Sequence, residues 1–431
     1  ERRSLWKYSQ RLLRLSHHFR RLRLQELLWA LCVWLIRGGM KNAVRACCCF
    51  MVGIAGITLL INYCVTEMQG VAEGIASTLG ITLNVIDGGY GAIPYYGYVE
   101  LLFPALACII VLDIIMIGLG WTKVLWVDIH NTWHGLFVGL IAYAITDDYV
   151  LSLIITVIVL IILLKLADFV APRFQEFNNT PGVCCIASSA TMAGLFTCIV
   201  MKVIDKIPGL NSIKFSAEDI QDRFGIFGEQ IVLGAIIGLV LGLCAGFDIT
   251  GILECSVTLA ATLALFPKMA AFVCEGIVPV TTCIMTWMKK KFKGRRDLYI
   301  AVDPATLLGD PSVMATFVIE VPIMIVLCLL LPGVGFIPIA SLAALPYIVG
   351  GVAPYARGNM VHCVICTTLY LVLISYIATW MAPAITMGIE KSGLMADTVG
   401  NGALLTCWDE GGSILAGFVR MLLQLFGIAQ I

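Results

Sequence analysis

The sequence predicts an all-α polytopic membrane protein, with about 10–12 transmembrane helices, re-entrant segments and two inverted repeats. Of its 431 residues, 60% are hydrophobic and 13% are charged. Apolar runs such as 149–165 and 231–247 approach the roughly 20 residues that a helix needs to cross a bilayer. This composition excludes a soluble globular protein.

Residues 1–39 form a basic, amphipathic N-terminal segment. Its basic start and short apolar run at 27–36 resemble a signal peptide, but no small-residue cleavage site follows. We therefore expect an interfacial helix that leads into the first span. The net charge is zero, yet Lys and Arg cluster at 20–23 and 289–296, and the positive-inside rule places such clusters in the cytoplasm.

Weak internal similarity predicts a first membrane repeat at 40–204 and a second at 229–431. Val85-Ile86-Asp87-Gly88 has a counterpart in Ala301-Val302-Asp303-Pro304, 216 positions later, and the run ending at Pro172 has one ending at Pro383, 211 positions later. Each proline is followed by a Gly/Ser segment, at 182–194 and 402–413, that reads as a re-entrant loop. Halves with an odd number of spans would be inverted.

A polar linker at 205–228 joins the predicted repeats. Ser216 and Asp219 have the spacing of a capping box at a helix start. Glycines then recur every four residues from Gly234 to Gly246, which favours close approach of a neighbouring helix.

The 17 cysteines lie mostly inside apolar runs and are interpreted as small hydrophobic residues. The Cys363-x-x-Cys366 pair, with His362 beside it, lies in an apolar helix, and this context argues against a metal or redox role. His130 and His134 are four residues apart, but no acidic spacing supports a shared metal. No Walker A loop, zincin motif or nucleophile elbow occurs, so we expect no metal, no cofactor and no catalytic residue in this chain.

The polar stretch at 122–134 interrupts these apolar runs. If it is helical, Asp128, Asn131 and His134 share one stripe, which predicts a ligand site because polar groups at membrane depth are costly. A buried polar knot between helices is the alternative.

Several of these motifs together resemble the membrane component, enzyme IIC, of galactitol-type bacterial phosphotransferase systems (PTS), within the ascorbate/galactitol superfamily. The resemblance covers about residues 40–413. The motifs that carry it are Val127-Asp128-Ile129 with Asn131 and Trp133-His134, Ile207-Pro208-Gly209, Asp303-Pro304-Ala305 and Arg357-Gly358-Asn359. Two departures concern specificity: Ile186-Ala187-Ser188 replaces a frequent Pro-His-Gly, and Asp310 stands where His is common.

The resemblance implies a multi-pass permease of the bacterial inner membrane that binds galactitol or a similar polyol or sugar. It also implies phosphorylation by a phosphocysteine on enzyme IIB, which enzyme IIA charges, and a homodimer with no nucleic-acid partner. The chain would thus be the transport component of a phosphotransferase complex, and whether it counts as an enzyme stays open.

A polyol needs carboxylate, amide and imidazole partners, with aromatic faces against its carbon chain. The aromatic candidates are Tyr90, Trp126 and Trp133. The predicted substrate-binding residues are Asp87, Asp128, Asn131, His134, Asp303 and Asp310. Helix capping is the alternative role for Asp87 and Asp303.

Two other function classes stay open at this point. One is an ion-coupled secondary transporter of a small polyol or sugar acid, with Asp128 or Asp303 as proton carrier. The other is a membrane enzyme or receptor with a polar pocket. The motifs leave the particular polyol or sugar undecided.

Overall fold

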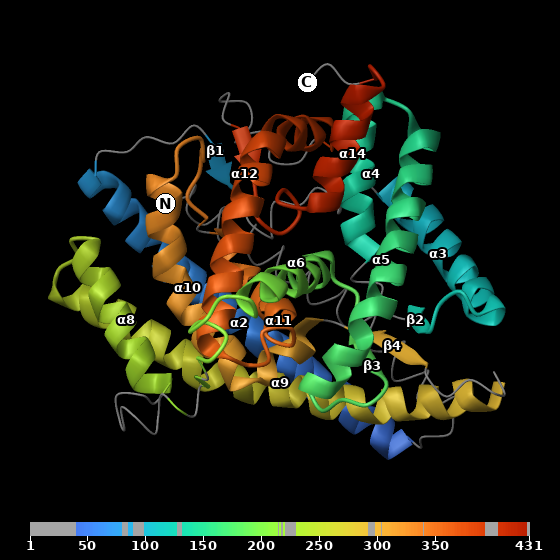
Figure 1. Cartoon of the computed structure of the whole chain (residues 1–431), viewed down its shortest axis with the longest axis horizontal. Helices are drawn as coiled ribbons and strands as arrows, with labels where there is room; N and C mark the ends of the chain where they lie inside the picture. The colour runs from blue at the N-terminus through green and yellow to red at the C-terminus, as the bar shows by residue number, and fades with distance from the viewer. Residues whose placement is uncertain are drawn as a thin grey trace, which may run out of the picture.

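The computed structural model describes residues 40–79, 85–88, 99–126, 132–213, 215–216, 219, 230–291, 298–302, 304–338, 340–392 and 404–428. The expectations for the N-terminal segment 1–39 lie outside these residues. The described part is mostly helical, which confirms the predicted all-α class of polytopic membrane protein (Figure 1).

The described helices of the first predicted repeat are α2 (Met40–Leu79), α3 (Val99–Leu119), α4 (Thr132–Thr146), α5 (Tyr149–Phe177) and α6 (Ser188–Ile204). Those of the second are α8 (Gln230–Cys244), α9 (Ile249–Lys291), α10 (Pro311–Leu330), α11 (Leu345–Val352), α12 (Met360–Ser392) and α14 (Ile414–Leu425), with the short 3-10 helices η4 (Pro304–Gly309) and η5 (Ala340–Ala343).

Three described helices, α5, α10 and α12, are long and apolar enough to cross a membrane, and seven shorter apolar helices accompany them. Helix α5 shows how these helices divide their side chains between an exposed and a buried face. Val150, Ile154 and Ile158 recur every four residues and are exposed, whereas Thr156 and Leu160 face the interior. An outward apolar stripe suits lipid, because lipid takes the place that water has around a soluble protein.

Helices α2, α8 and α9 pack together along one edge of the molecule, and α9 runs along the bottom of Figure 1. The glycine spacing predicted close helix approach there, and the structure confirms it. A Cβ on Gly238 would lie 2.4 Å from the carbonyl oxygen of Cys255 in α9, and one on Gly234 would lie 2.8 Å from that of Leu259. Only a residue without a side chain permits this contact.

In the described part of the chain, five short strands that the sequence did not predict pair between the two predicted repeats. They are β1 (Val85–Asp87), β2 (Val124–Trp126), β3 (Val183–Cys185), β4 (Tyr299–Val302) and β5 (Leu404–Thr406). β1 pairs in parallel with β5, and β4 lies in parallel between β2 and β3. These pairs satisfy backbone groups where the chain is not helical inside the protein.

The two Gly/Ser segments are buried, at 182–194 and 405–413. Each follows a long helix with an internal proline, Pro172 in α5 and Pro383 in α12. Each contains or follows a strand and leads into a further helix, α6 or α14. The order of elements is therefore alike in both halves, while the division into inverted repeats stays a prediction.

The linker folds back onto the start of α12. The backbone N–H of Ser216 donates to Asp219 at 2.7 Å and the N–H of Asp219 donates to Ser216 Oγ at 3.1 Å, which confirms the capping box. The Asn359 side chain donates to the carbonyl oxygen of Ile213 at 2.5 Å, and Arg357 pairs with Asp205 at 3.2 Å. The Arg357-Gly358-Asn359 motif thus anchors the linker.

Candidate functional site

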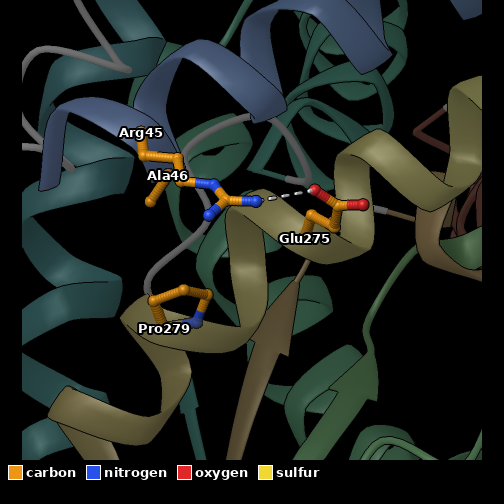
Figure 2. A pocket seen from close by; sticks show the side chains of 4 residues that line it. All are labelled: Arg45, Ala46, Glu275 and Pro279. Carbon is orange, nitrogen blue, oxygen red and sulfur yellow. Dashed lines mark ion pairs between the residues drawn. The ribbon is translucent and has the colours of Figure 1, made fainter. Parts of the chain in front are cut away.

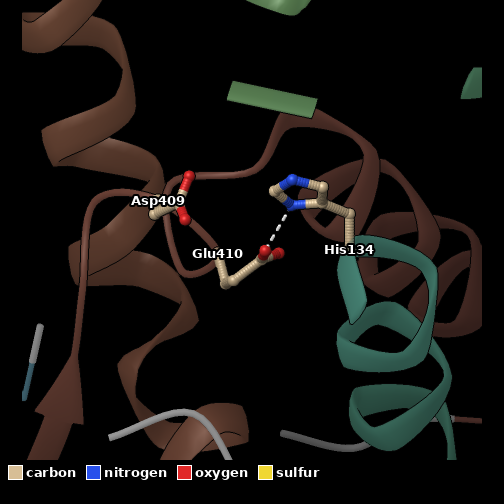
Figure 3. A group of neighbouring side chains, drawn as sticks. All are labelled: His134, Asp409 and Glu410. Atoms are coloured by element: carbon tan, nitrogen blue, oxygen red, sulfur yellow. Dashed lines mark hydrogen bonds and ion pairs between the residues drawn. The ribbon is translucent and has the colours of Figure 1, made fainter. Parts of the chain in front are cut away.

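Three polar side chains converge inside the protein, from one helix and one re-entrant segment. His134 lies in the first turn of α4, and Asp409 and Glu410 lie in the turn after β5 (Figure 3). One ligating atom of each residue lies within 4.8 Å of the other two. Their exposed fractions are 3%, 6% and 0%. We call this the His134–Asp409–Glu410 cluster.

Within the cluster, His134 Nδ1 and Glu410 Oε1 form a hydrogen bond. An ionised carboxylate only accepts, so the Nδ1–H of His134 donates to it. Such a bond fixes the tautomer and the orientation of the imidazole ring. The second oxygen, Glu410 Oε2, is buried and has no hydrogen-bond partner in the described part of the chain. Leaving a buried acceptor unsatisfied costs about 1–3 kcal/mol, so a donor brought by a ligand would bind here favourably.

A tight turn presents the two carboxylates. The N–H of Gly412 donates to the carbonyl oxygen of Trp408 at 3.0 Å, and the N–H of Ser413 donates to the backbone carbonyl oxygen of Glu410 at 3.0 Å. A Cβ on Gly412 would lie 2.4 Å from the Trp408 carbonyl oxygen, so this position requires glycine. Ser413 then caps α14 by accepting from the N–H of Ala416. The chain thus turns sharply between β5 and α14, with Asp409 and Glu410 at the bend.

Trp408, beside the acids, is held from two sides. Its backbone N–H donates to Ser341 Oγ at 2.9 Å, and its indole N–H donates to Ser375 Oγ at 2.8 Å. Ser341 in turn donates to both oxygens of Asp87, through its hydroxyl at 2.6 Å and its N–H at 2.7 Å. Asp87 therefore supports the cluster through Ser341 and Trp408.

The described residues include three of the six predicted substrate-binding residues, Asp87, His134 and Asp310. His134 lies in the cluster, and Asp87 lies behind it. Asp310 caps α10, where its carboxylate accepts from the N–H of Ser312 at 2.8 Å. Trp126 ends β2 and its N–H donates to Asp113 at 2.7 Å. The remaining predicted positions are Tyr90, Asp128, Asn131, Asp303 and the side chain of Trp133, and they lie outside the described residues.

The stripe of Asp128, Asn131 and His134 stays a prediction, because Asp128 and Asn131 lie outside the described residues. Residues 124–126 form strand β2, and α4 begins at Thr132. His134 is therefore helical, but no described helix links it to Asp128 and Asn131. A three-residue strand carries too little periodicity to be distinguished from a helix in an apolar context.

Asp409 and Glu410 belong to the candidate site but are absent from the residues predicted from the sequence. The signal was present, because two adjacent acids occur in an apolar, glycine-rich segment already predicted to be re-entrant. Carboxylates in such a setting mark a functional site by default.

A separate hollow of about 360 Å³ lies between α2 and α9 and is lined by Arg45, Ala46, Glu275 and Pro279 (Figure 2). Arg45 and Glu275 form an ion pair at 3.8 Å, and their side chains are 80% and 55% exposed. Solvent screens such a pair, and each charge already has a partner. This hollow lacks the buried polar acceptor that distinguishes the cluster.

Apolar helices that enclose a polar cluster on irregular backbone define a polytopic membrane protein, and the cluster is its candidate functional site. The sequence model of the PTS system sugar-specific permease component family, EIIC-GAT, matches residues 27–399. The chain belongs to this family.

Two kinds of relative support this membership. The galactitol-specific EIIC component of Escherichia coli K12 is 30% identical over 377 residues, which covers 87% of this chain and 82% of the relative. A putative permease IIC component of the same strain is 28% identical over 353 residues, which covers 82% and 80%. The resemblance found from the motifs is confirmed.

Proposed function

We propose that this chain is the permease of a bacterial PTS that carries galactitol or a similar polyol across the inner membrane for phosphorylation. The phosphoryl group comes from the phosphocysteine of a separate enzyme IIB, which enzyme IIA charges, and the permease works as a homodimer. The observation that carries the proposal is the buried His134–Asp409–Glu410 cluster in a member of this permease family.

The cluster suits a polyol because each hydroxyl both donates and accepts a hydrogen bond. Glu410 Oε2 is a buried acceptor with no hydrogen-bond donor among the described residues, so a substrate hydroxyl can donate to it. His134 contributes a ring whose orientation Glu410 already fixes. Asn131 and Asp128 belong to the same site in this proposal, since they precede His134 by three and six residues.

Substitution of the predicted binding residues tests the site. His134→Ala and Asn131→Ala should each weaken galactitol binding about two- to tenfold, the equivalent of one lost hydrogen bond of about 0.5–1.5 kcal/mol. Binding is measured by calorimetry on the purified, detergent-solubilised protein. His362→Ala is the matched control: His362 is also buried, but its ring contacts the carbonyl oxygen of Leu210 at 3.0 Å, in the linker. Unchanged affinity in both site variants would place the binding site elsewhere.

Transport mode is tested separately in membrane vesicles. Galactitol phosphate should accumulate inside only when phosphorylated enzyme IIB is supplied on the cytoplasmic side. Concentrative uptake of unmodified galactitol driven by a proton gradient alone would instead support an ion-coupled secondary transporter and refute the proposal.

A further inference from the structure

We propose that Glu410 accepts the proton of the substrate hydroxyl during phosphoryl transfer, with His134 as its positioning residue. This inference rests on the proposed function and deepens it, because it assigns a chemical step to the permease itself. The two oxygens of the Glu410 carboxylate would then have different tasks: Oε1 is held by His134, and Oε2 faces the substrate.

The reaction requires such an acceptor. The substrate hydroxyl oxygen attacks the phosphorus of the phosphocysteine, the new O–P bond forms, and the S–P bond breaks. The electron pair of the broken bond stays on the cysteine sulfur, which leaves as a thiolate. The hydroxyl proton must leave the attacking oxygen, which would otherwise become positively charged. A carboxylate oxygen within hydrogen-bond reach can take this proton.

The structure favours Glu410 for this role on geometry. It is fully buried, one oxygen is bonded to the imidazole of His134, and the other oxygen has no partner among the described residues. The bond to His134 limits rotation of the carboxylate, so Oε2 keeps one direction. A proton acceptor must be positioned before its proton affinity matters.

Three other buried or partly buried acids in the described part of the chain differ in this respect. Glu320 in α10 is also fully buried, but the hydroxyl of Thr368 lies 3.0 and 3.2 Å from its two oxygens. Asp87 has both oxygens bonded to Ser341. Asp113 does keep one oxygen without a partner, but the other holds the backbone of β2 at Trp126. Glu410 alone among these four is bonded to an imidazole.

The test separates binding from chemistry with Glu410→Gln. Glutamine keeps the size of the side chain and one acceptor oxygen, but it cannot take a proton at neutral pH. Purified permease in proteoliposomes is mixed with enzyme IIB that has been phosphorylated beforehand. Galactitol phosphate is then measured in a single turnover, and the galactitol Kd is measured without enzyme IIB.

The expected result for Glu410→Gln is a Kd within about threefold of wild type and a turnover rate about 10²–10⁴-fold lower, the usual contribution of general acid–base catalysis. Glu410→Asp retains a carboxylate and should recover part of the rate. Glu320→Gln is the matched control, a buried carboxylate on another helix pair, and should keep the wild-type rate within about twofold.

Several results would overturn the inference. They are a wild-type rate in Glu410→Gln, an equal loss of rate and binding, or a rate lost only in Asp113→Asn. A rate that is lost on dialysis against EDTA and restored by Mg²⁺ or Mn²⁺ would also overturn it, since the cluster would then hold a cation. Because enzyme IIB is supplied already phosphorylated, any effect of cations on its own phosphorylation does not influence this comparison. If the wild-type protein neither binds galactitol nor forms its phosphate, the proposed function itself fails.

Discussion

Ser341 lies between Asp87 and the turn that carries the cluster, and its removal tests whether this chain of hydrogen bonds positions the site. Ser341→Ala deletes the bond to Asp87 at 2.6 Å and the acceptor for the backbone N–H of Trp408 at 2.9 Å. The N–H of Ser341 still donates to Asp87, so the carboxylate keeps one partner.

The expected loss of stability follows from the burial of these groups. Trp408 is fully buried, so its orphaned N–H costs about 1–3 kcal/mol. Asp87 is only half-buried, so water replaces part of the lost bond, and we add about 1 kcal/mol for it. The variant should therefore lose about 2–4 kcal/mol, and its galactitol affinity should fall about two- to tenfold, because the backbone before Asp409 loses its anchor.

Ser375→Ala is the matched comparison. It removes the acceptor of the Trp408 indole N–H at 2.8 Å and leaves the backbone anchor in place. It should lower the melting temperature to a similar degree and leave the galactitol Kd within about twofold, since only a side-chain tether is lost. Melting is followed by intrinsic fluorescence and affinity by calorimetry. Equal affinities in the two variants, with both melting temperatures lowered, would show that the Asp87–Ser341–Trp408 chain is purely structural.

The remaining predictions concern the linker and the helix contacts. Asp219→Ala should lower the free energy of unfolding by about 0.5–2 kcal/mol, because the capping box is lost. Its galactitol affinity should stay unchanged. Melting and binding are measured on the same protein, and a weaker affinity would contradict this prediction. Gly238→Ala should reduce melting temperature and monodisperse yield, because its Cβ would lie 2.4 Å from the carbonyl oxygen of Cys255. Gly118→Ala, with nothing within 4 Å of its added Cβ, should be neutral or stabilising by up to about 1 kcal/mol, and equal behaviour of the two glycine variants would refute the packing argument.

Features that depend on local sequence were predicted correctly. The helical membrane class follows from composition, because apolar runs of this length have few other stable folds. The capping box of Ser216 and Asp219 is a contact between residues three apart, and the glycine spacing from Gly234 needs only a regular helix. The residues that determine the capping box and the glycine spacing lie within a few helical turns of one another.

Features that join distant parts of the chain were not predicted. His134 and Glu410 are 276 positions apart, and Asp87 and Ser341 are 254 positions apart. Neither pair has a spacing that a single sequence reveals. The sequence therefore placed His134 and Asp87 in one substrate site, whereas the described structure bonds His134 to Glu410 and uses Asp87 to hold the turn behind it.

The shortest elements of the fold set the geometry of the cluster. Strands β1 and β5 pair with Asp87 opposite Thr406, and the N–H of Gly88 donates to Thr406 at 2.8 Å. Packed helices can slide by small amounts, but a strand pair changes register only in steps of about 3.3 Å, with loss of its hydrogen bonds. Asp409 and Glu410 follow β5 within four residues, so their distance from Asp87 depends on this register. Backbone pairing between the two predicted repeats thus acts together with the Asp87–Ser341–Trp408 hydrogen bonds to hold the acids beside His134.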